Sequence, residues 1–95
     1  MRKYECMMII DPTLGDDVRN DLLKEIKTEF KTHGTTVVTE DLQGVKHLAY
    51  NIRASSEGYY VLYMLESDGK GLLEVTKFLN LKKQVWRHMF VRLED

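Results

Sequence analysis

The order of strand-like and helix-like segments constrains this chain more than any other feature of its sequence. Runs of apolar and β-branched residues indicate strands, and apolar residues three and four positions apart indicate helices. These patterns predict strands over residues 4–10, 35–52, 59–66 and 85–93, and helices over residues 16–33 and 68–79. The resulting order is β-α-β-β-α-β, the ferredoxin-like split βαβ motif.

This order predicts an α+β fold in which two helices pack on one face of a four-stranded antiparallel sheet. A chain of 95 residues is long enough for one core, so we expect a single domain over residues 1–95. No helix remains to cover the other face of the sheet. The first strand is nevertheless apolar on both sides, and such strands are covered on both faces or carry a partner on one. Its two sets are Cys6, Met8 and Ile10 on one side and Met7 and Ile9 on the other.

Apolar spacing and end signals define the two predicted helices. Gly34 lies where a left-handed residue is expected to follow the first helix. Asp68 is expected to cap the second helix, and Asn80 to end it. The apolar faces are Val18, Leu22, Leu23, Ile26 and Phe30 in the first helix, and Leu72, Val75, Leu79 with Thr76 in the second.

The two middle strands are expected to form a hairpin. The strand over residues 35–52 contains Gly44, which predicts a bend or bulge at that point. Residues 55–58 are expected to form the turn. The strand over residues 59–66 is the richest of all in Tyr, Val and Leu, so it is expected to be a well-formed strand.

The charge balance limits how this chain binds nucleic acid. It has 14 basic and 15 acidic side chains and a net charge of −1, whereas proteins that bind nucleic acid by charge alone are usually clearly basic. A local basic patch or a basic partner remains compatible with the sequence. One segment contains five basic residues and no acid, namely Lys77, Lys82, Lys83, Arg87 and Arg92.

Cysteine usage and hydropathy indicate the compartment. The single cysteine, Cys6, cannot form an intramolecular disulfide, which fits a reducing environment. The apolar run near the N-terminus is too short for a signal peptide, and no segment approaches the ~20 apolar residues of a membrane helix. We therefore expect a cytoplasmic protein.

No combination of residues in the sequence indicates catalysis. There is no helical His-Glu-x-x-His, no cysteine pair for zinc and no phosphate-binding glycine loop. The histidines, His33, His47 and His88, are far apart in sequence. Cys6 is expected to be a small core residue rather than a nucleophile. We therefore predict a protein that is not an enzyme and that has no catalytic residue, metal or cofactor.

Three short segments resemble parts of other families with this fold. Residues 43–45, Gln-Gly-Val, resemble the phosphate loop of acylphosphatases, but that loop follows the first strand and carries an arginine, so this resemblance is rejected. Residues 57–61 lack the basic and small residues that an RNA-recognition domain needs. Residues 11–15 resemble the loop of ACT domains, which bind amino acids at a dimer interface. An ACT-like small-molecule-binding regulatory domain is therefore the alternative function.

Residues 44–53, Gly-Val-Lys-His-Leu-Ala-Tyr-Asn-Ile-Arg, resemble the signature segment of the bacterial small-subunit ribosomal protein S-six family at every constrained position. Residues 1–5, Met-Arg-Lys-Tyr-Glu, are similar to the start of that family. The resemblance covers essentially the whole chain. It implies a structural constituent of the small ribosomal subunit, located in the ribosome, with no enzyme activity.

The resemblance also implies the binding partners. Members of the family bind the central domain of small-subunit ribosomal RNA as a heterodimer with ribosomal protein S-eighteen, and the isolated chain is expected to be a monomer. A basic partner would supply the phosphate attraction that a near-neutral chain lacks. The apolar residues on the open face of the sheet would then be the footprint of that partner.

Six basic residues are the candidates for RNA binding. One group is expected to face phosphates where the first and last strands lie side by side, and a second pair lies on the second strand. Trp86, beside the first group, is expected to pack in the sheet or to present its ring to a base or to the partner. The first group is Arg2, Lys3, Arg87 and Arg92, and the second is Lys46 and Arg53.

Overall fold

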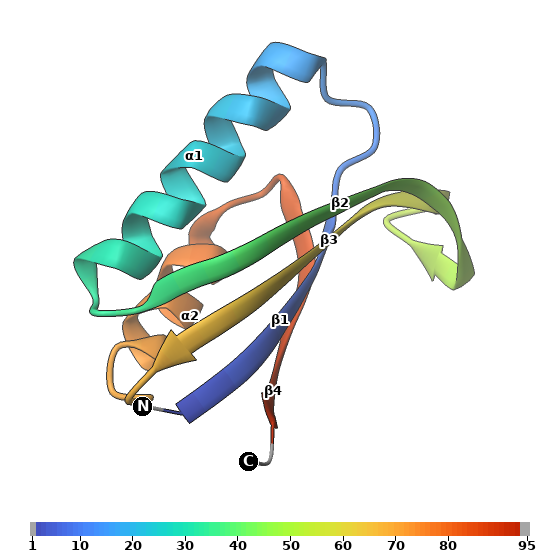
Figure 1. The fold of residues 1–95 in the computed structure, drawn as a ribbon. Helices are drawn as coiled ribbons and strands as arrows, with labels where there is room; N and C mark the ends of the chain where they lie inside the picture. The colour runs from blue at the N-terminus through green and yellow to red at the C-terminus, as the bar shows by residue number, and fades with distance from the viewer. Residues whose placement is uncertain (1, 94–95) are drawn as a thin grey trace.

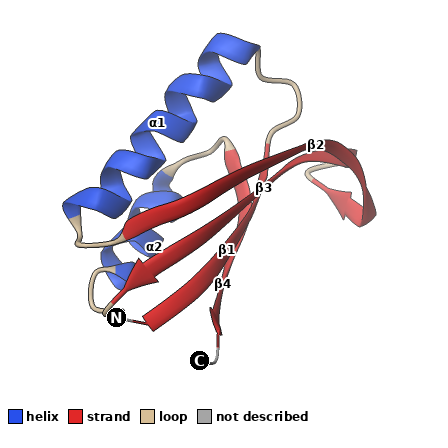
Figure 2. Cartoon of the chain, viewed as in Figure 1, coloured by secondary structure: helices blue, strands red, loops and turns tan. Residues whose placement is uncertain are grey.

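The computed structural model describes residues 2–93 and shows two helices on one face of a four-stranded antiparallel sheet (Figures 1 and 2). The order of the strands across the sheet is β2-β3-β1-β4. This arrangement confirms the predicted fold class. The elements are β1 (Arg2–Ile10), α1 (Asp16–Thr32), β2 (Thr36–Ile52), β3 (Ser55–Ser67), α2 (Leu72–Leu81) and β4 (Val85–Leu93).

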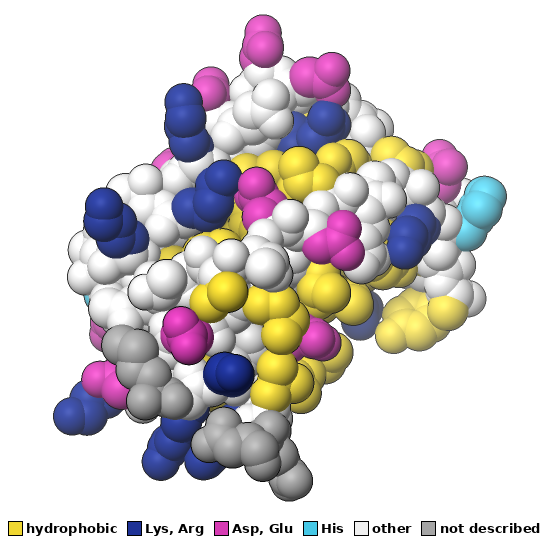
Figure 3. All heavy atoms as spheres, viewed as in Figure 1, with side chains coloured by type: hydrophobic (Ala, Val, Ile, Leu, Met, Phe, Trp, Pro, Cys, Tyr) yellow, Lys and Arg dark blue, Asp and Glu magenta, His cyan; other side chains and the backbone are white. Residues whose placement is uncertain are grey.

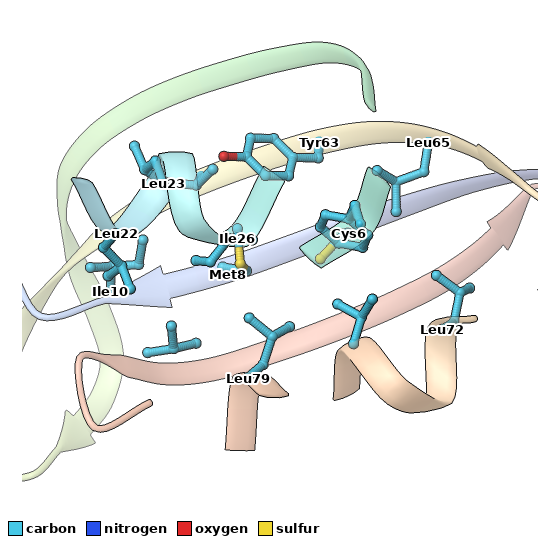
Figure 4. Close-up of a cluster of buried hydrophobic side chains, with 14 of the residues drawn as sticks. Cys6, Met8, Ile10, Leu22, Leu23, Ile26, Tyr63, Leu65, Leu72 and Leu79 are labelled. Atoms are coloured by element: carbon cyan, nitrogen blue, oxygen red, sulfur yellow. The ribbon is translucent and has the colours of Figure 1, made fainter. Parts of the chain in front are cut away.

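The core lies between the helices and the sheet (Figure 4). From Tyr4 onward, side chains of β1 alternate between buried and half-buried, as the period of two requires. The buried set points toward the helices, whereas Met7 and Ile9 lie on the open face. Buried side chains of the core include Cys6, Met8 and Ile10 from β1, Leu22, Leu23, Ile26 and Phe30 from α1, Val61, Tyr63 and Leu65 from β3, and Leu72, Val75 and Leu79 from α2.

The predicted apolar stripe of α1 is confirmed except at Val18, which is 51% exposed. Residues four apart overshoot a turn of 3.6 residues by about 40°, so a series spaced by four drifts around the helix. Three steps of four therefore place Val18 about 120° away from Phe30. At the other end of α1, Gly34 has φ of 75° and its amide bonds to the Lys31 carbonyl, which confirms the left-handed residue after the helix.

The predicted cap of α2 is wrong. The Asp68 carboxylate accepts a hydrogen bond from the Lys70 amide at 2.9 Å and so closes a local turn three residues before the helix. Gly69, with φ of 90°, continues this turn, and Gly71 is the residue that precedes the helix. The helix also continues beyond Asn80 to Leu81.

The β2–β3 hairpin is longer than predicted, and its turn lies elsewhere. Residues 55–58 belong to β3, and the turn consists of Arg53 and Ala54, with φ of 50° and 63°. Two-residue hairpin turns of this kind usually contain Asn or Gly, so an Arg-Ala pair gives no turn signal in the sequence. The predicted irregularity near Gly44 is confirmed, because the register shifts between Leu42 and Gly44. The end of the hairpin curls away beyond the rest of the sheet (Figure 1).

The thiol of Cys6 is expected to be unreactive in the folded protein. Its side chain is fully buried, and burial raises its pKa from 9.0 to about 12. Three pKa units mean about a thousandfold less thiolate at neutral pH. At pH 8 we expect N-ethylmaleimide to modify Cys6 at least ~100-fold more slowly in buffer than in denaturant, as measured by mass spectrometry. Equal rates in the two solutions would contradict this prediction.

Candidate nucleic-acid interface

The structure separates the six predicted RNA-binding residues into different regions. Lys3 pairs with Leu93 and Arg92 with Tyr4, so the start of β1 and the end of β4 lie side by side, as predicted. Arg87 instead pairs with Ile9, six residues farther along β1. At about 3.3 Å per residue, this distance is ~20 Å. Arg87 therefore does not lie in one group with Arg2, Lys3 and Arg92.

The cations at the strand ends, Arg2, Lys3 and Arg92, are exposed. None of the ion pairs among residues 2–93 includes them. Lys3 lies opposite Glu66 of β3, which offsets part of its charge. In Figure 3, several Lys and Arg side chains gather at the end of the sheet where β1 begins.

A second basic region is a hollow of about 360 Å³ at the start of β4. Three parts of the chain line it: the turn of the β2–β3 hairpin, the end of α2 with the loop that follows, and β4 itself. We call it the β4 hollow. It is lined by Arg53, Leu79, Asn80, Lys82, Lys83, Val85, Trp86, Arg87 and His88.

Among residues 2–93, four cations line the β4 hollow and no carboxylate does. Lys82 is partly neutralised, because its Nζ lies 2.5 Å from Glu25 Oε1. The Arg87 guanidinium lies 5.4 Å from the centre of the Tyr50 ring and donates a hydrogen bond to the Tyr50 hydroxyl at 3.4 Å. Burial lowers the pKa of His88, which keeps its imidazole neutral at neutral pH. The hollow is therefore a local positive region on a chain with a net charge of −1.

Trp86 and two cations of this hollow were expected from the sequence as possible contacts with RNA. The sequence did not place the two cations, Arg53 and Arg87, together. They are 34 positions apart, and their approach depends on how the hairpin curls. Lys82 and Lys83 were visible only as part of the acid-free basic segment. Lys46 lies elsewhere, with its Nζ 5.5 Å from the centre of the Tyr60 ring and 2.9 Å from Gln43 Oε1.

The open face of the sheet carries apolar side chains that neither of the helices within residues 2–93 covers. Met7 lies opposite both Leu62 and Met89, and Val91 lies opposite Glu5 on the same face. Met89 is 56% exposed and Val91 40% exposed. Figure 3 shows hydrophobic side chains in a band across the sheet. A contiguous exposed apolar surface of this kind is typical of a protein-binding site.

Gly58 holds the curled end of the hairpin close to this face. It is buried, and a Cβ at this position would lie 2.4 Å from Ile9 Cγ2 and 3.2 Å from Leu48 Cδ2. Only glycine therefore lets Ile9 and Leu48 pack above it without a shift. Tyr60, Leu48 and Tyr50 line a smaller hollow of about 120 Å³ with Ile9 and Arg87.

Other kinds of site are not seen in the part of the chain that the structure describes. Within residues 2–93, no three His, Cys, Asp or Glu side chains lie close enough together to hold a metal ion. No helix in the same range is long and apolar enough to cross a membrane.

Comparison with known proteins decides the family. A family profile described as Ribosomal protein S6 matches residues 3–92. The chain belongs to the ribosomal protein S6 family. A relative from Fusobacterium nucleatum, named small ribosomal subunit protein bS6, is 37% identical over 92 residues, which are 97% of this chain and 98% of the relative. A bS6 protein from Clostridium botulinum is 34% identical over 94 residues, which are 99% of this chain and the whole of the relative.

Solved structures agree with the S6 family. The crystal structure of 30S ribosomal protein S6 from Thermotoga maritima matches with a TM-score of 0.92 and 26% identity, over 97% of this chain and 87% of that chain. The C-terminal domain of the MgtC protein from Mycobacterium tuberculosis has a TM-score of 0.64 and 11% identity over 99% of this chain and 89% of that chain, so it shares the fold alone. The S6 family is structural and not enzymatic, as the sequence predicted. Family membership also sets aside the ACT-like alternative.

Proposed function

We propose that this member of the S6 family binds the central domain of small-subunit ribosomal RNA as a heterodimer with ribosomal protein S-eighteen, in the cytoplasmic ribosome. The observation that carries the proposal is the uncovered apolar face of the sheet, which lies between two basic regions. An apolar surface without a helix favours a protein partner, and separated cations favour contact with phosphates at more than one point.

The charge of the chain supports a joint mode of binding. With a net charge of −1, the isolated protein gains little from long-range attraction to phosphates. A basic partner on the open face would supply that attraction, while the strand-end cations and the β4 hollow would add local contacts. The isolated chain is accordingly proposed to be a monomer with weak RNA affinity.

The test is a binding experiment with the chain, S-eighteen and a central-domain ribosomal RNA fragment. The pair and each protein alone are titrated onto the RNA at two salt concentrations. We expect tight binding by the pair only, with an affinity that falls as salt increases. If the chain neither pairs with S-eighteen nor changes its RNA binding, the proposal is wrong.

A substitution on the open face tests the protein interface without RNA. Met89→Glu places a charge in the exposed apolar surface, so we expect it to weaken pairing with S-eighteen by about tenfold or more in calorimetry. Leu73→Glu is the matched control, because Leu73 is an apolar residue on α2 rather than on the sheet. The exposed fractions of the two side chains are similar, 63% for Leu73 and 56% for Met89. Equal losses in both variants would argue against the open face as the interface.

A further inference from the structure

Trp86, the only tryptophan of the chain, does not pack against the hydrophobic core. Its side chain is half-buried, yet it is not among the partly buried hydrophobic residues that pack against the core. Phe78 and Phe90, which lie nearby in sequence, do pack there. Trp86 instead lines the β4 hollow. A large aromatic side chain outside the core is available to stack on a flat ligand.

The cations around Trp86 define the charge of such a ligand. Arg53, Lys83 and Arg87 line the same hollow, and none of them forms an ion pair among residues 2–93. The cation–π contact and the hydrogen bond of the Arg87 guanidinium to Tyr50 restrict its movement, which lowers the entropy cost of holding an anion. The hollow therefore combines an aromatic surface with a positively charged edge.

The volume and the polar groups fit one nucleotide. A hollow of about 360 Å³ lies within the range of ~300–1,000 Å³ usual for small-ligand sites. Asn80 and the neutral His88 supply groups that both donate and accept hydrogen bonds, as a base edge or a ribose hydroxyl requires. Bases in a duplex are stacked inside the helix, so only an unpaired nucleotide can place its base against Trp86.

We infer that the β4 hollow binds one unpaired nucleotide of RNA, with the base against Trp86 and the phosphate beside Arg53, Lys83 and Arg87. This inference rests on the proposed RNA-binding function and names the form of RNA that this part of the surface takes. It adds Trp86, Lys83, Asn80 and His88 to the residues that contact RNA.

Fluorescence of Trp86 tests the inference directly, because no other tryptophan contributes to the signal. The full chain, without S-eighteen, is titrated with single-stranded tetraadenylate and tetrauridylate, with a short RNA duplex, with adenosine monophosphate and with inorganic phosphate. We expect saturable quenching by the tetranucleotides and none by the duplex or by phosphate alone. Absence of quenching by the tetranucleotides, or equal quenching by the duplex, overturns the inference. Much tighter binding of adenosine monophosphate than of tetraadenylate would point to a free nucleotide and would also overturn the assignment to RNA.

Substitutions separate stacking from charge. With a dye-labelled tetranucleotide, Trp86→Leu is expected to weaken binding about 5- to 150-fold, whereas Trp86→Phe retains an aromatic face and most of the affinity. Lys83→Gln is expected to weaken binding and to reduce the salt slope by ~1. Lys77→Gln is the matched control, because Lys77 is an exposed lysine on α2 that does not line the hollow. If Lys77→Gln has the same effect as Lys83→Gln, the hollow is not the binding site.

The two proposals fail in distinguishable ways. If the chain does not pair with S-eighteen but tetranucleotides quench Trp86, the joint function fails and the nucleotide site stands. If the pair binds ribosomal RNA tightly while Trp86 emission and the Trp86→Leu affinity stay unchanged, the joint function stands and the nucleotide site is wrong.

Discussion

Replacing Phe30 with alanine is expected to lower the free energy of unfolding by about 3–5 kcal/mol. The Phe30 side chain is fully buried and lies in the last turn of α1. Its ring meets Tyr63 and Phe90 edge to face, with centroids 6.1 and 6.2 Å away. Alanine would remove both contacts and leave a cavity, because two strands and a helix cannot all collapse into the space.

Urea denaturation monitored by circular dichroism measures this loss. A domain of this size has a total stability of about 5–15 kcal/mol, so the variant is expected to be partly unfolded or close to it at 37 °C. Val18→Ala is the matched control, because Val18 lies on the same helix in the same four-residue series but is 51% exposed. We expect its effect to stay within about 0.5 kcal/mol. If Phe30→Ala lowered the free energy of unfolding only slightly, the core around Phe30 would be able to rearrange and fill the space.

Gly71→Ala is expected to destabilise the protein by about 3 kcal/mol, the upper end of the range for overpacked sites. The backbone of Gly71 has φ of −78° and ψ of −12°, which alanine adopts without strain. A Cβ at this position, however, would lie only 2.0 Å from the backbone oxygen of His33. Because that oxygen belongs to the end of α1 and not to a flexible side chain, the two helices would have to separate.

Gly15→Ala separates this contact from the general effect of removing a glycine. Gly15 also precedes a helix, in this case α1, and a Cβ there would meet nothing within 4 Å. Both substitutions remove a glycine from the position before a helix, so the difference between their denaturation midpoints reports the contact with His33. Equal midpoints would show that the α1–α2 contact gives way at little cost.

The fold could be predicted from the sequence because its signals are local. The apolar spacing of α1, the left-handed Gly34 and the dense strand around Val61 each arise from neighbouring residues. The position of the hairpin turn could not be predicted, because Arg53 and Ala54 adopt positive φ angles that their side chains do not favour. The pairing and packing of the whole hairpin impose this conformation.

The candidate site was only partly predictable for a different reason. The sequence shows that Arg53, Lys83 and Arg87 are basic, but only the folded chain shows that they share one hollow. It likewise suggests grouping Arg87 with Arg92, since they are five residues apart on one strand. The register of β4 on β1 places them at different ends of the contact, opposite Ile9 and Tyr4. Residue type could thus be read from the sequence, whereas proximity depends on register and on the curl of the hairpin.

Pairing of β1 with β4 has a consequence for synthesis of the protein. β1 is made first and lies inside the sheet, yet one of its two neighbours in the sheet is made last. Until β4 has left the ribosome, the hydrogen-bonding edge of β1 stays open and Cys6, which pairs with Phe90, lacks cover on that side. A nascent chain interrupted before Val85 therefore exposes the unpaired backbone hydrogen-bonding groups of β1 to chaperones and proteases. Only a translated β4 closes that edge, so protection of β1 marks the chains in which synthesis has passed β4.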